Sequence, residues 1–460
     1  MSTKYVAVAR ADEESQDADS SFEASDQAPL ISSPKNASGS TPEHAPEGKS
    51  GGEGGGESGG GGFQGYYPLP VYLASSAKAL WNYQPELNTL LVFVPISIVC
   101  EVAGMAPGWV FFTALAGLVP LAALLGATTE ALASYTNQTL GGLLNATFGN
   151  ATEVIISAIA LMDAKPTNNM IRVIQLSLLG SILSNLLLVL GCAFLLGGCR
   201  MMTRPESVGP RKSMQTYNSA AASTNSGMLT LAVITLVLPD ILQATSAMGA
   251  CENLDFSRYV SVMMLFMYGL YIYFQLVTHQ DLFEDEDDGE DEDEDLGFYG
   301  SLGWMALLTI LISILSEMLV GAIEPTSEEW GVPYLFIGVI LIPIVGNAAE
   351  HATAVVMAYK DKMEIAMGVA VGSSVQVAVF VIPFMVVVAW GADIPLGLDF
   401  HPFETATVLL SIVLVNVIIS KGTATYLEGV MLLMVYIIIS LGFILHRNEV
   451  TFAQPRTHWS

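Results

Sequence analysis

Basic residues and cysteines are scarce in this sequence. The 460 residues include 17 lysines and arginines, against 44 aspartates and glutamates, and only four cysteines. The cysteines lie singly in or beside apolar segments, without the spacing of a disulfide framework or a metal site, so we interpret them as small buried residues. A formal charge of −27 gives no reason to expect a nucleic-acid partner. The four residues are Cys100, Cys192, Cys199 and Cys251.

The negative charge is concentrated in two polar segments. Eleven acids lie in residues 1–78, and twelve lie in the run DLFEDEDDGEDEDED at 281–295. Residues 1–65 include GGEGGGESGGGG and are too polar to form a packed core, so the tail is predicted to be disordered. We interpret the acidic run as a solvated linker, and the alternative is that it attracts or senses cations.

Between these segments the sequence is strongly apolar, with 52% hydrophobic residues overall and a mean hydropathy of +0.52. Apolar runs of about 20 residues are long enough to cross a bilayer. They predict an all-α polytopic membrane protein with about 11 transmembrane helices. The candidate crossings are centred near residues 96, 120, 152, 183, 236, 267, 312, 345, 377, 411 and 436.

The distribution of lysine and arginine predicts the orientation. With a cytosolic amino terminus, twelve of the seventeen basic residues fall in the tail and in the loops that follow even-numbered helices. This bias agrees with the positive-inside rule. Eleven crossings then place the carboxyl terminus in a lumen. No secretory signal peptide opens the chain, so we expect the first membrane helix to direct insertion.

The apolar region contains two copies of one pattern. TTEALA (128–133) precedes GNATE (149–153), and LSEMLV (315–320) precedes GNAAE (346–350). Downstream, LLGSILSNLLLVLG (178–191) matches AVGSSVQVAVFVIP (370–383). Each copy has five helices, an odd number, so the second must enter the membrane from the opposite side, as in the inverted repeats of transporters.

The predicted organisation follows from these boundaries. It consists of a disordered cytosolic tail (1–78), an extra first transmembrane helix (79–108), transmembrane repeat 1 (109–280), an acidic cytosolic linker (281–296), transmembrane repeat 2 (297–446) and a lumenal tail (447–460).

Six acids lie within the apolar segments, and the same helical middles contain no lysine or arginine: Glu101, Glu130, Glu153, Asp240, Glu317 and Glu350. A carboxylate at the bilayer centre costs about 2.5–3.5 kcal/mol and usually marks function. Since no basic residue can neutralise these acids, we expect a mobile cation to do so. Glu101 belongs to the unpaired first helix, and Asp240 follows Pro239 near an interface, so neither is a strong site candidate.

The repeated motif predicts a divalent-cation site. In a helix, residues three apart share a face, so Asn150 should point with Glu153, and Asn347 with Glu350. Two carboxylates balance a doubly charged ion, and Ca²⁺ prefers six to eight oxygen ligands. Further oxygens are expected from Gln376, from the backbone at Gly149 and Gly346, and from the hydroxyls of Thr152, Ser181 and Ser373, although helix packing alone would explain the two serines.

The same predicted site would account for the exchange of a metal ion for protons. Burial and a second nearby carboxylate both disfavour the ionised form of a carboxyl group, so an empty site should take up protons. Metal ion and protons would then compete. Glu130 and Glu317 are candidates for proton coupling or gating, with structural hydrogen bonds as the alternative. His351 could relay protons or could be a packed hydrogen-bonding residue.

The two GNAxE motifs, His351 and the acidic run between the repeats resemble the calcium/proton exchangers of the cation/Ca²⁺ antiporter superfamily. The LLVFVP segment (90–95) is similar to the first helix of that family. The resemblance covers about residues 80–446. It implies, as in the fungal and plant vacuolar branch, exchange of cytosolic Ca²⁺ for lumenal H⁺, with Mn²⁺ as a cargo of some members. It also implies Glu153 and Glu350 as central ligands, assisted by Asn150, Asn347 and Gln376.

Three other functions are alternatives to calcium/proton exchange. A sodium/calcium exchanger would be expected to carry Gly-Thr-Ser-type segments around its acids. An intramembrane hydrolase needs a nucleophile–base pair or His-Glu-x-x-His spacing, and neither is found. A passive channel suits a two-carboxylate site less well than a carrier does. We therefore expect no enzyme activity and no cofactor beyond transported Ca²⁺ and H⁺, with the lipid bilayer as surroundings and a homo-oligomer left open.

Overall fold

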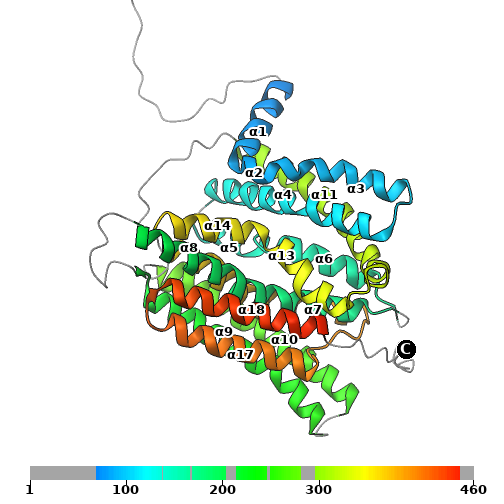
Figure 1. Cartoon of the computed structure of the whole chain (residues 1–460), viewed down its shortest axis with the longest axis vertical. Coiled ribbons are helices and arrows are strands. Elements are labelled where there is room, and N and C mark those ends of the chain that lie inside the picture. Colours follow the sequence, from blue (N-terminus) through cyan, green and yellow to red (C-terminus); the bar gives the residue numbers. More distant parts are fainter. Residues whose placement is uncertain are drawn as a thin grey trace, which may run out of the picture. The chain divides into compact units, whose positions relative to one another are not determined.

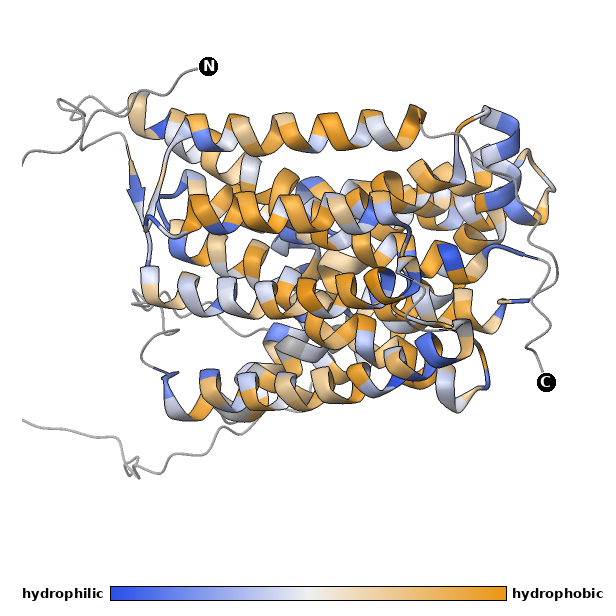
Figure 2. Cartoon of the chain, turned by 90° about the horizontal axis from the view of Figure 1, so that it is seen from below, coloured by the Kyte–Doolittle hydropathy of each residue, from blue (hydrophilic) through white to orange (hydrophobic). Residues whose placement is uncertain are grey.

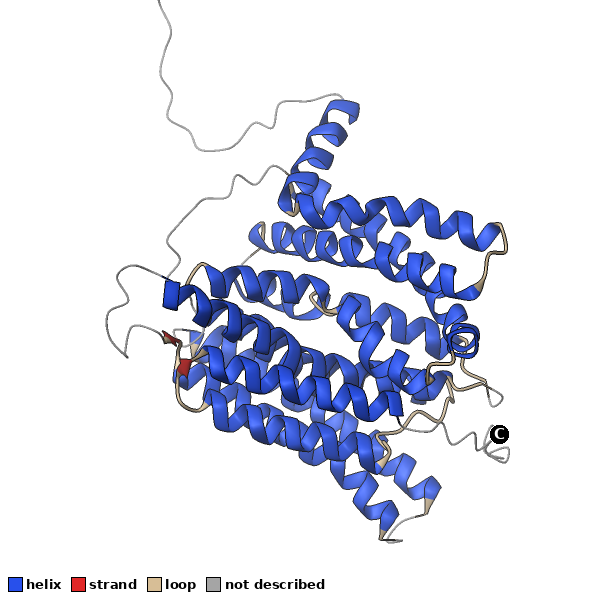
Figure 3. Ribbon diagram, in the orientation of Figure 1, coloured by secondary structure: helices blue, strands red, loops and turns tan. Residues whose placement is uncertain are grey.

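The computed structural model describes residues 69–136, 138–165, 168–203, 214–245, 249–280 and 296–445. These residues are almost entirely helical (Figure 1; Figure 3). Most of the predicted tail, the acidic run 281–295 and residues 446–460 lie outside them. The predicted roles of those segments therefore stay predictions.

The first half contains α1 (Leu69–Tyr83), α2 (Pro85–Asn88), the 3-10 turn η1 (Thr89–Val92), α3 (Phe93–Val102), α4 (Pro107–Ser134), α5 (Gln138–Phe148), α6 (Ala151–Met162), α7 (Met170–Leu183), the π-helical turn η2 (Ser184–Val189), α8 (Leu190–Thr203), β1 (Gln215–Thr216), α9 (Ser219–Ala244), α10 (Ala250–Tyr273) and the π-helical turn η4 (Phe274–Thr278).

The second half contains α11 (Phe298–Trp330), α12 (Tyr334–Phe336), the π-helical turn η6 (Ile337–Leu341), α13 (Ile342–Gly346), α14 (Ala348–Tyr359), α15 (Met363–Gln376), the π-helical turn η7 (Val377–Val381), α16 (Ile382–Gly391), α17 (Pro402–Ile419), β2 (Thr423–Ala424) and α18 (Tyr426–Leu445).

The described helices confirm the predicted fold class. Nine helical stretches in these residues are long and apolar enough to cross a membrane. A tenth is the pair formed by Tyr334–Gly346 and Ala348–Tyr359, which meet at a bend of 55°. α5 and α6 would supply an eleventh crossing if they were counted together, so the number eleven stays a prediction.

The amino-terminal boundaries differ from the prediction. Helix α1 begins at Leu69, so the disordered tail cannot extend to residue 78 as expected. The predicted helix 79–108 is also interrupted, because Gln84 has non-helical angles (φ −143°, ψ 75°) and Pro85 starts α2. A residue before proline is sterically driven out of the helical region, which explains this break. The membrane-crossing part runs over Pro85–Val102.

Large apolar side chains face outward along the helices. On α10, Met263 and Phe266 are exposed, and on α17 and α18 the same is true of Leu410, Ile438 and Leu441. Figure 2 shows hydrophobic residues along most of the helix lengths, with hydrophilic residues gathered toward the helix ends. Exposed apolar surface on this scale is unfavourable in water and favourable in lipid. The chain is therefore a multi-pass membrane protein.

The two halves contain equivalent elements. The long helices α4 and α11 pack along each other (Figure 1). The broken segment of each half packs against the long helix of the other half, α6 on α11 and α14 on α4. A π-helical turn follows the Gly-Ser segment in both halves, as η2 and η7. These paired features agree with an internal repeat, and its inverted topology stays a prediction.

A two-stranded antiparallel contact links the loops at one end of the helices. β1 pairs with β2, with Gln215 opposite Ala424. The Gln215 amide Nε2 donates to the carbonyl oxygen of Ala358 near the end of α14 at 2.8 Å, and the Tyr217 hydroxyl donates to the carbonyl oxygen of Ile419 at 3.1 Å. Burial, and secondarily the charge of Glu428, raises the pKa of Tyr217 above its ordinary value. The loop before α9, in the first half, is thereby fixed to the second half.

Gly180 allows the two halves to approach closely. A Cβ atom at this position would lie 2.2 Å from the carbonyl oxygen of Val339 and 2.6 Å from Cγ of Pro343. The corresponding glycine of the second half, Gly372, has no such neighbour within 4 Å. Only glycine fits at Gly180, whereas the space at Gly372 is open.

We predict that Gly180→Ala destabilises the protein by about 1–3 kcal/mol, since the new methyl group must displace backbone atoms of η6. The matched variant Gly372→Ala should be neutral or slightly stabilising, because alanine is the better helix former. Thermal unfolding of the purified protein in detergent, followed by tryptophan fluorescence, measures both. Equal unfolding temperatures for the two variants would contradict this account of the interface.

Candidate cation site

The helix that carries each GNAxE motif is broken at the motif. Asn150 (φ −106°, ψ 24°) lies between α5 and α6, and Asn347 (φ −93°, ψ 19°) lies between α13 and α14. Each asparagine therefore precedes the helix that carries its glutamate, so the expected sharing of a helix face does not apply to it. The reason is local, since glycine and asparagine are both poor helix formers and favour non-helical backbone. Each glutamate consequently lies in the first turn of a new helix, where the helix dipole favours negative charge.

The two asparagines do not cap their own helices but bind the opposite half. The Asn150 amide Nδ2 donates to Gln376 Oε1 at 2.6 Å, and Ser373 Oγ donates to Asn150 Oδ1 at 3.1 Å. In the same way, Ser181 Oγ donates to Asn347 Oδ1 at 2.9 Å. Each Gly-Asn motif is thus bonded to the Gly-Ser segment of the other half.

The two motif carboxylates lie at the junction of the halves. Glu153 is 8% exposed, and Glu350 is half-buried. Their charges interact with each other. Oε1 of Glu153 also approaches the other motif, since a Cβ atom on Gly346 would lie 3.5 Å from it. Glu153 Oε1 and Glu350 Oε2 are buried without a hydrogen-bond partner among the described residues.

A small cavity adjoins Glu153. Its volume is about 20 Å³, which is room for one water molecule or one bare metal ion. It lies between α6, α7 and α13. The lining residues are Glu153, Ile156, Ser157, Ser177, Leu178, Ser181, Ile342, Pro343 and Gly346.

The remaining candidates lie around this centre at different depths. Thr152 is buried on α6, and Gly149 is exposed at the break. Glu130 and Glu317 are exposed on α4 and α11, so they do not belong to the buried cluster. Their predicted role in proton coupling or gating stays a prediction.

His351 follows Glu350 directly on α14 and is half-buried. Adjacent residues on a helix point about 100° apart, so the ring does not share the direction of the Glu350 side chain. The two interpretations, proton relay and packed residue, both stay predictions.

Sequence reasoning missed one polar residue of this network, Asn185. It is fully buried at the π-helical turn η2, and its amide Nδ2 donates to Ser373 Oγ at 3.0 Å. The bond orients the Ser373 hydroxyl toward Asn150. The aligned position of the second half is Val377, so a search for features shared by both halves could not find it. An amide within the apolar run SNLLLVLG was the available signal.

A second polar cluster lies where α7 and α17 begin. Arg172 contacts Glu404 at 2.5 Å, and Arg172 also donates to Gln175 Oε1 at 2.7 Å. Asp240 accepts a hydrogen bond from Thr405 and lies close enough for its charge to interact with Arg172. Arg172 forms its ion pair with Glu404 rather than with Asp240. Neither Glu153 nor Glu350 forms an ion pair in the described part of the chain.

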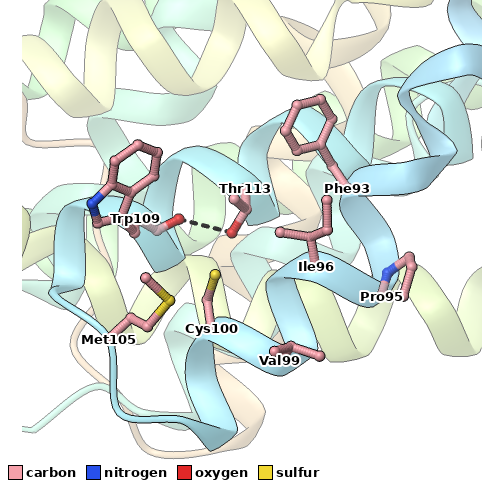
Figure 4. Close-up of a pocket in the computed structure, with 8 residues that line it drawn as sticks. All are labelled: Phe93, Pro95, Ile96, Val99, Cys100, Met105, Trp109 and Thr113. Carbon is pink, nitrogen blue, oxygen red and sulfur yellow. Dashed lines mark hydrogen bonds between the residues drawn. The ribbon is translucent and has the colours of Figure 1, made fainter.

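A larger cavity, of about 500 Å³, lies between α3 and α4 and has a different character (Figure 4). Its lining is apolar apart from Thr113, whose hydroxyl donates to the carbonyl oxygen of Trp109 at 2.7 Å. It offers no charge to a cation. The lining residues are Phe93, Pro95, Ile96, Val99, Cys100, Met105, Trp109 and Thr113.

The donor set at the junction suits a hard cation. Carboxylate, amide and hydroxyl oxygens are the ligands preferred by Ca²⁺ and similar ions. The site lies where two halves meet and includes broken helices, an arrangement typical of secondary transporters. Fold and candidate site together point to a class: a polytopic membrane transporter, with a candidate cation site between its halves.

The chain belongs to the sodium/calcium exchanger protein family, which it matches over residues 107–277 and 300–445. It is 45% identical over 376 residues to vacuolar cation/proton exchanger 3 of Oryza sativa subsp. japonica, covering 79% of this chain and 87% of that protein. The solved structure of native YfkE is 32% identical, with a TM-score of 0.65, and covers 78% of this chain and 100% of that chain.

A crystal structure of selenium-substituted YfkE, described as a Ca²⁺/H⁺ antiporter protein, is 30% identical, with a TM-score of 0.61. It covers 82% of this chain and 100% of that chain. These matches confirm the resemblance to calcium/proton exchangers that the GNAxE motifs indicated.

The buried ion pair yields a stability prediction. Arg172→Met leaves Glu404, whose side chain is 3% exposed, without its cation, at an expected cost of about 3 kcal/mol. The matched variant is Lys165→Met, since Lys165 pairs with Asp163 where both side chains are well exposed, and its loss should cost at most about 1 kcal/mol. Thermal unfolding in detergent measures both. A larger loss for Lys165→Met would show that the cluster does not stabilise the junction of α7 and α17.

Proposed function

We propose that the protein is a secondary active antiporter that exchanges Ca²⁺ for H⁺, with Glu153 and Glu350 as the shared binding groups. The observation that carries the proposal is a pair of carboxylates whose charges interact, each with a buried oxygen that has no hydrogen-bond partner among the described residues. Relatives named vacuolar cation/proton exchangers and a Ca²⁺/H⁺ antiporter support it.

Charge balance supplies the coupling. One Ca²⁺ compensates both carboxylates, and protons compensate them when the metal ion leaves. A site that carries either cargo, but is too costly to move while doubly ionised, exchanges one for the other. Asn150, Asn347 and Gln376 would complete the oxygen shell, because their side chains already lie at the junction of the two halves.

The Asn150 amide Nδ2 donates to Gln376 Oε1, and this oxygen keeps a second lone pair that a cation could use. The hydrogen bond therefore holds the Gln376 side chain at the junction of the halves without removing it from the proposed oxygen shell.

The proposed location is the vacuolar membrane, by analogy with the named relatives. The excess of lysine and arginine in the tail and in the loops after even-numbered helices supports a cytosolic amino terminus and a lumenal carboxyl terminus. An acidic lumen would then supply the protons, and Ca²⁺ would be sequestered from the cytosol. Each pH unit contributes about 1.4 kcal/mol per proton to this transport.

The test is transport by the purified protein in liposomes with an acidic interior. Ca²⁺ should enter the liposomes, and uptake should stop when a protonophore collapses the pH gradient. Glu153→Gln and Glu350→Gln should each lower uptake about 100-fold or more, since removing one of two charges that balance a divalent ion costs several kcal/mol. Addition of Mn²⁺ as a competitor reports whether the same site accepts it.

The matched control is Glu101→Gln, which removes an exposed carboxylate on α3 outside the candidate site. Its transport should equal that of the wild type. Uptake that is driven by a sodium gradient and ignores the protonophore would refute proton exchange. Normal uptake by both glutamine variants would refute the assigned site.

A further inference from the structure

A buried serine hydroxyl next to the candidate site has no hydrogen-bond partner within the described residues. Ser157 is 1% exposed, and its Oγ has no hydrogen-bond partner there. It follows Glu153 by four residues on α6, so the two side chains lie on the same face of the helix. Both residues line the cavity of about 20 Å³. Two polar groups without partners thus share one ion-sized space.

The other hydroxyls that line this cavity offer lone pairs rather than hydrogens. Ser181 already donates its hydrogen to Asn347 Oδ1, and Ser177 donates to the carbonyl oxygen of Ile174 at 3.1 Å. Each hydroxyl oxygen keeps acceptor capacity. With an unpartnered carboxylate oxygen of Glu153 beside them, the lining is rich in acceptors and favours a positively charged occupant.

The second half has no serine equivalent to Ser157. Alignment of GNATE with GNAAE places Ala354 at the equivalent position, and Ala354 is fully buried. The cavity extends from Glu153 toward the end of α6 and the beginning of α7. Ser157 lies nearer than Glu153 to the end of α6, and Ser177 lies nearer than Ser181 to the beginning of α7. In the proposed orientation this is the lumenal side.

We propose that Ser157 contributes its hydroxyl oxygen to a subsite for the transported divalent cation, one helical turn beyond Glu153. Glu153 lines both positions, so the cation passes from the junction of the two halves to this subsite without losing its carboxylate ligand. Ser181 and Ser177 provide further oxygens. The inference rests on the proposed Ca²⁺/H⁺ exchange and names a residue that the motif itself does not include.

Ser157→Ala and Ser157→Cys test the contact. In the liposome assay, Ser157→Ala should raise the KM for Ca²⁺ about 10-fold, the scale expected when one contact of a metal site is lost, with a smaller change in the maximal rate. Ser157→Cys replaces a hard oxygen by a soft sulfur, so Cd²⁺ should inhibit Ca²⁺ uptake at concentrations about 10-fold lower than for the wild type. A purely structural role for the hydroxyl would not create this sensitivity to a soft ion.

Ser301→Cys is the matched control, because Ser301 on α11 is also a fully buried serine whose Oγ lacks a partner among the described residues, and it does not line the cavity. It should keep the cadmium sensitivity of the wild type. A second readout needs no transport: the ultraviolet absorbance of a cadmium–thiolate bond in the purified protein should be larger for Ser157→Cys than for Ser301→Cys.

The outcomes separate the two proposals. Wild-type protein that takes up no Ca²⁺ refutes the exchange function. If the wild type transports, but Ser157→Ala keeps its KM and Ser157→Cys matches Ser301→Cys in both cadmium measurements, the subsite is refuted and the exchange function stands. An unchanged KM with normal cadmium sensitivity would identify the cavity as a packing defect or a water position.

Discussion

The rest of this structure depends on two carboxylates at the junction of the halves, each with a buried oxygen that has no hydrogen-bond partner among the described residues. Neither Glu153 nor Glu350 forms an ion pair in the described part of the chain. Their negative charge would therefore be neutralised by an exchangeable cation or by protons. Amides and hydroxyls of Asn150, Asn347 and Ser181 hold the neighbourhood in place without supplying a fixed positive charge.

The broken helices make this arrangement possible. In a continuous helix the direction of an asparagine side chain is set by the helix. At a break the backbone angles differ, so the side chain can point in another direction. Here the side chains of both asparagines form hydrogen bonds with the opposite half, so these contacts exist only when the halves pack together. The glycine contact at Gly180 brings η6 and α13 near enough for Gly346 to lie beside Glu153. Packing of the two halves therefore brings the residues of the candidate site together.

The fold class and the paired motifs could be predicted from the sequence, because burying a carboxylate in an apolar run is costly enough to be informative by itself. The role of Glu153 and Glu350 as central ligands stays a prediction. The sequence did not reveal the helix breaks, although Gly-Asn was a readable signal for them. Asn185 and Ser157 were not predicted, because neither has an equivalent residue in the other half. The Arg172–Glu404 pair joins residues 232 positions apart, and such a contact depends on helix packing that no local pattern encodes.

The two halves are similar but not identical at the site. Ser184 aligns with Gln376, Asn185 with Val377, and Ser157 with Ala354. In an inverted repeat, each half governs access from a different aqueous phase. Unequal halves would then give the carrier unequal affinities at its two openings, tight where the cation is rare and weaker where it accumulates. Such an imperfection in the pseudo-symmetry would adapt the carrier to a steep concentration gradient.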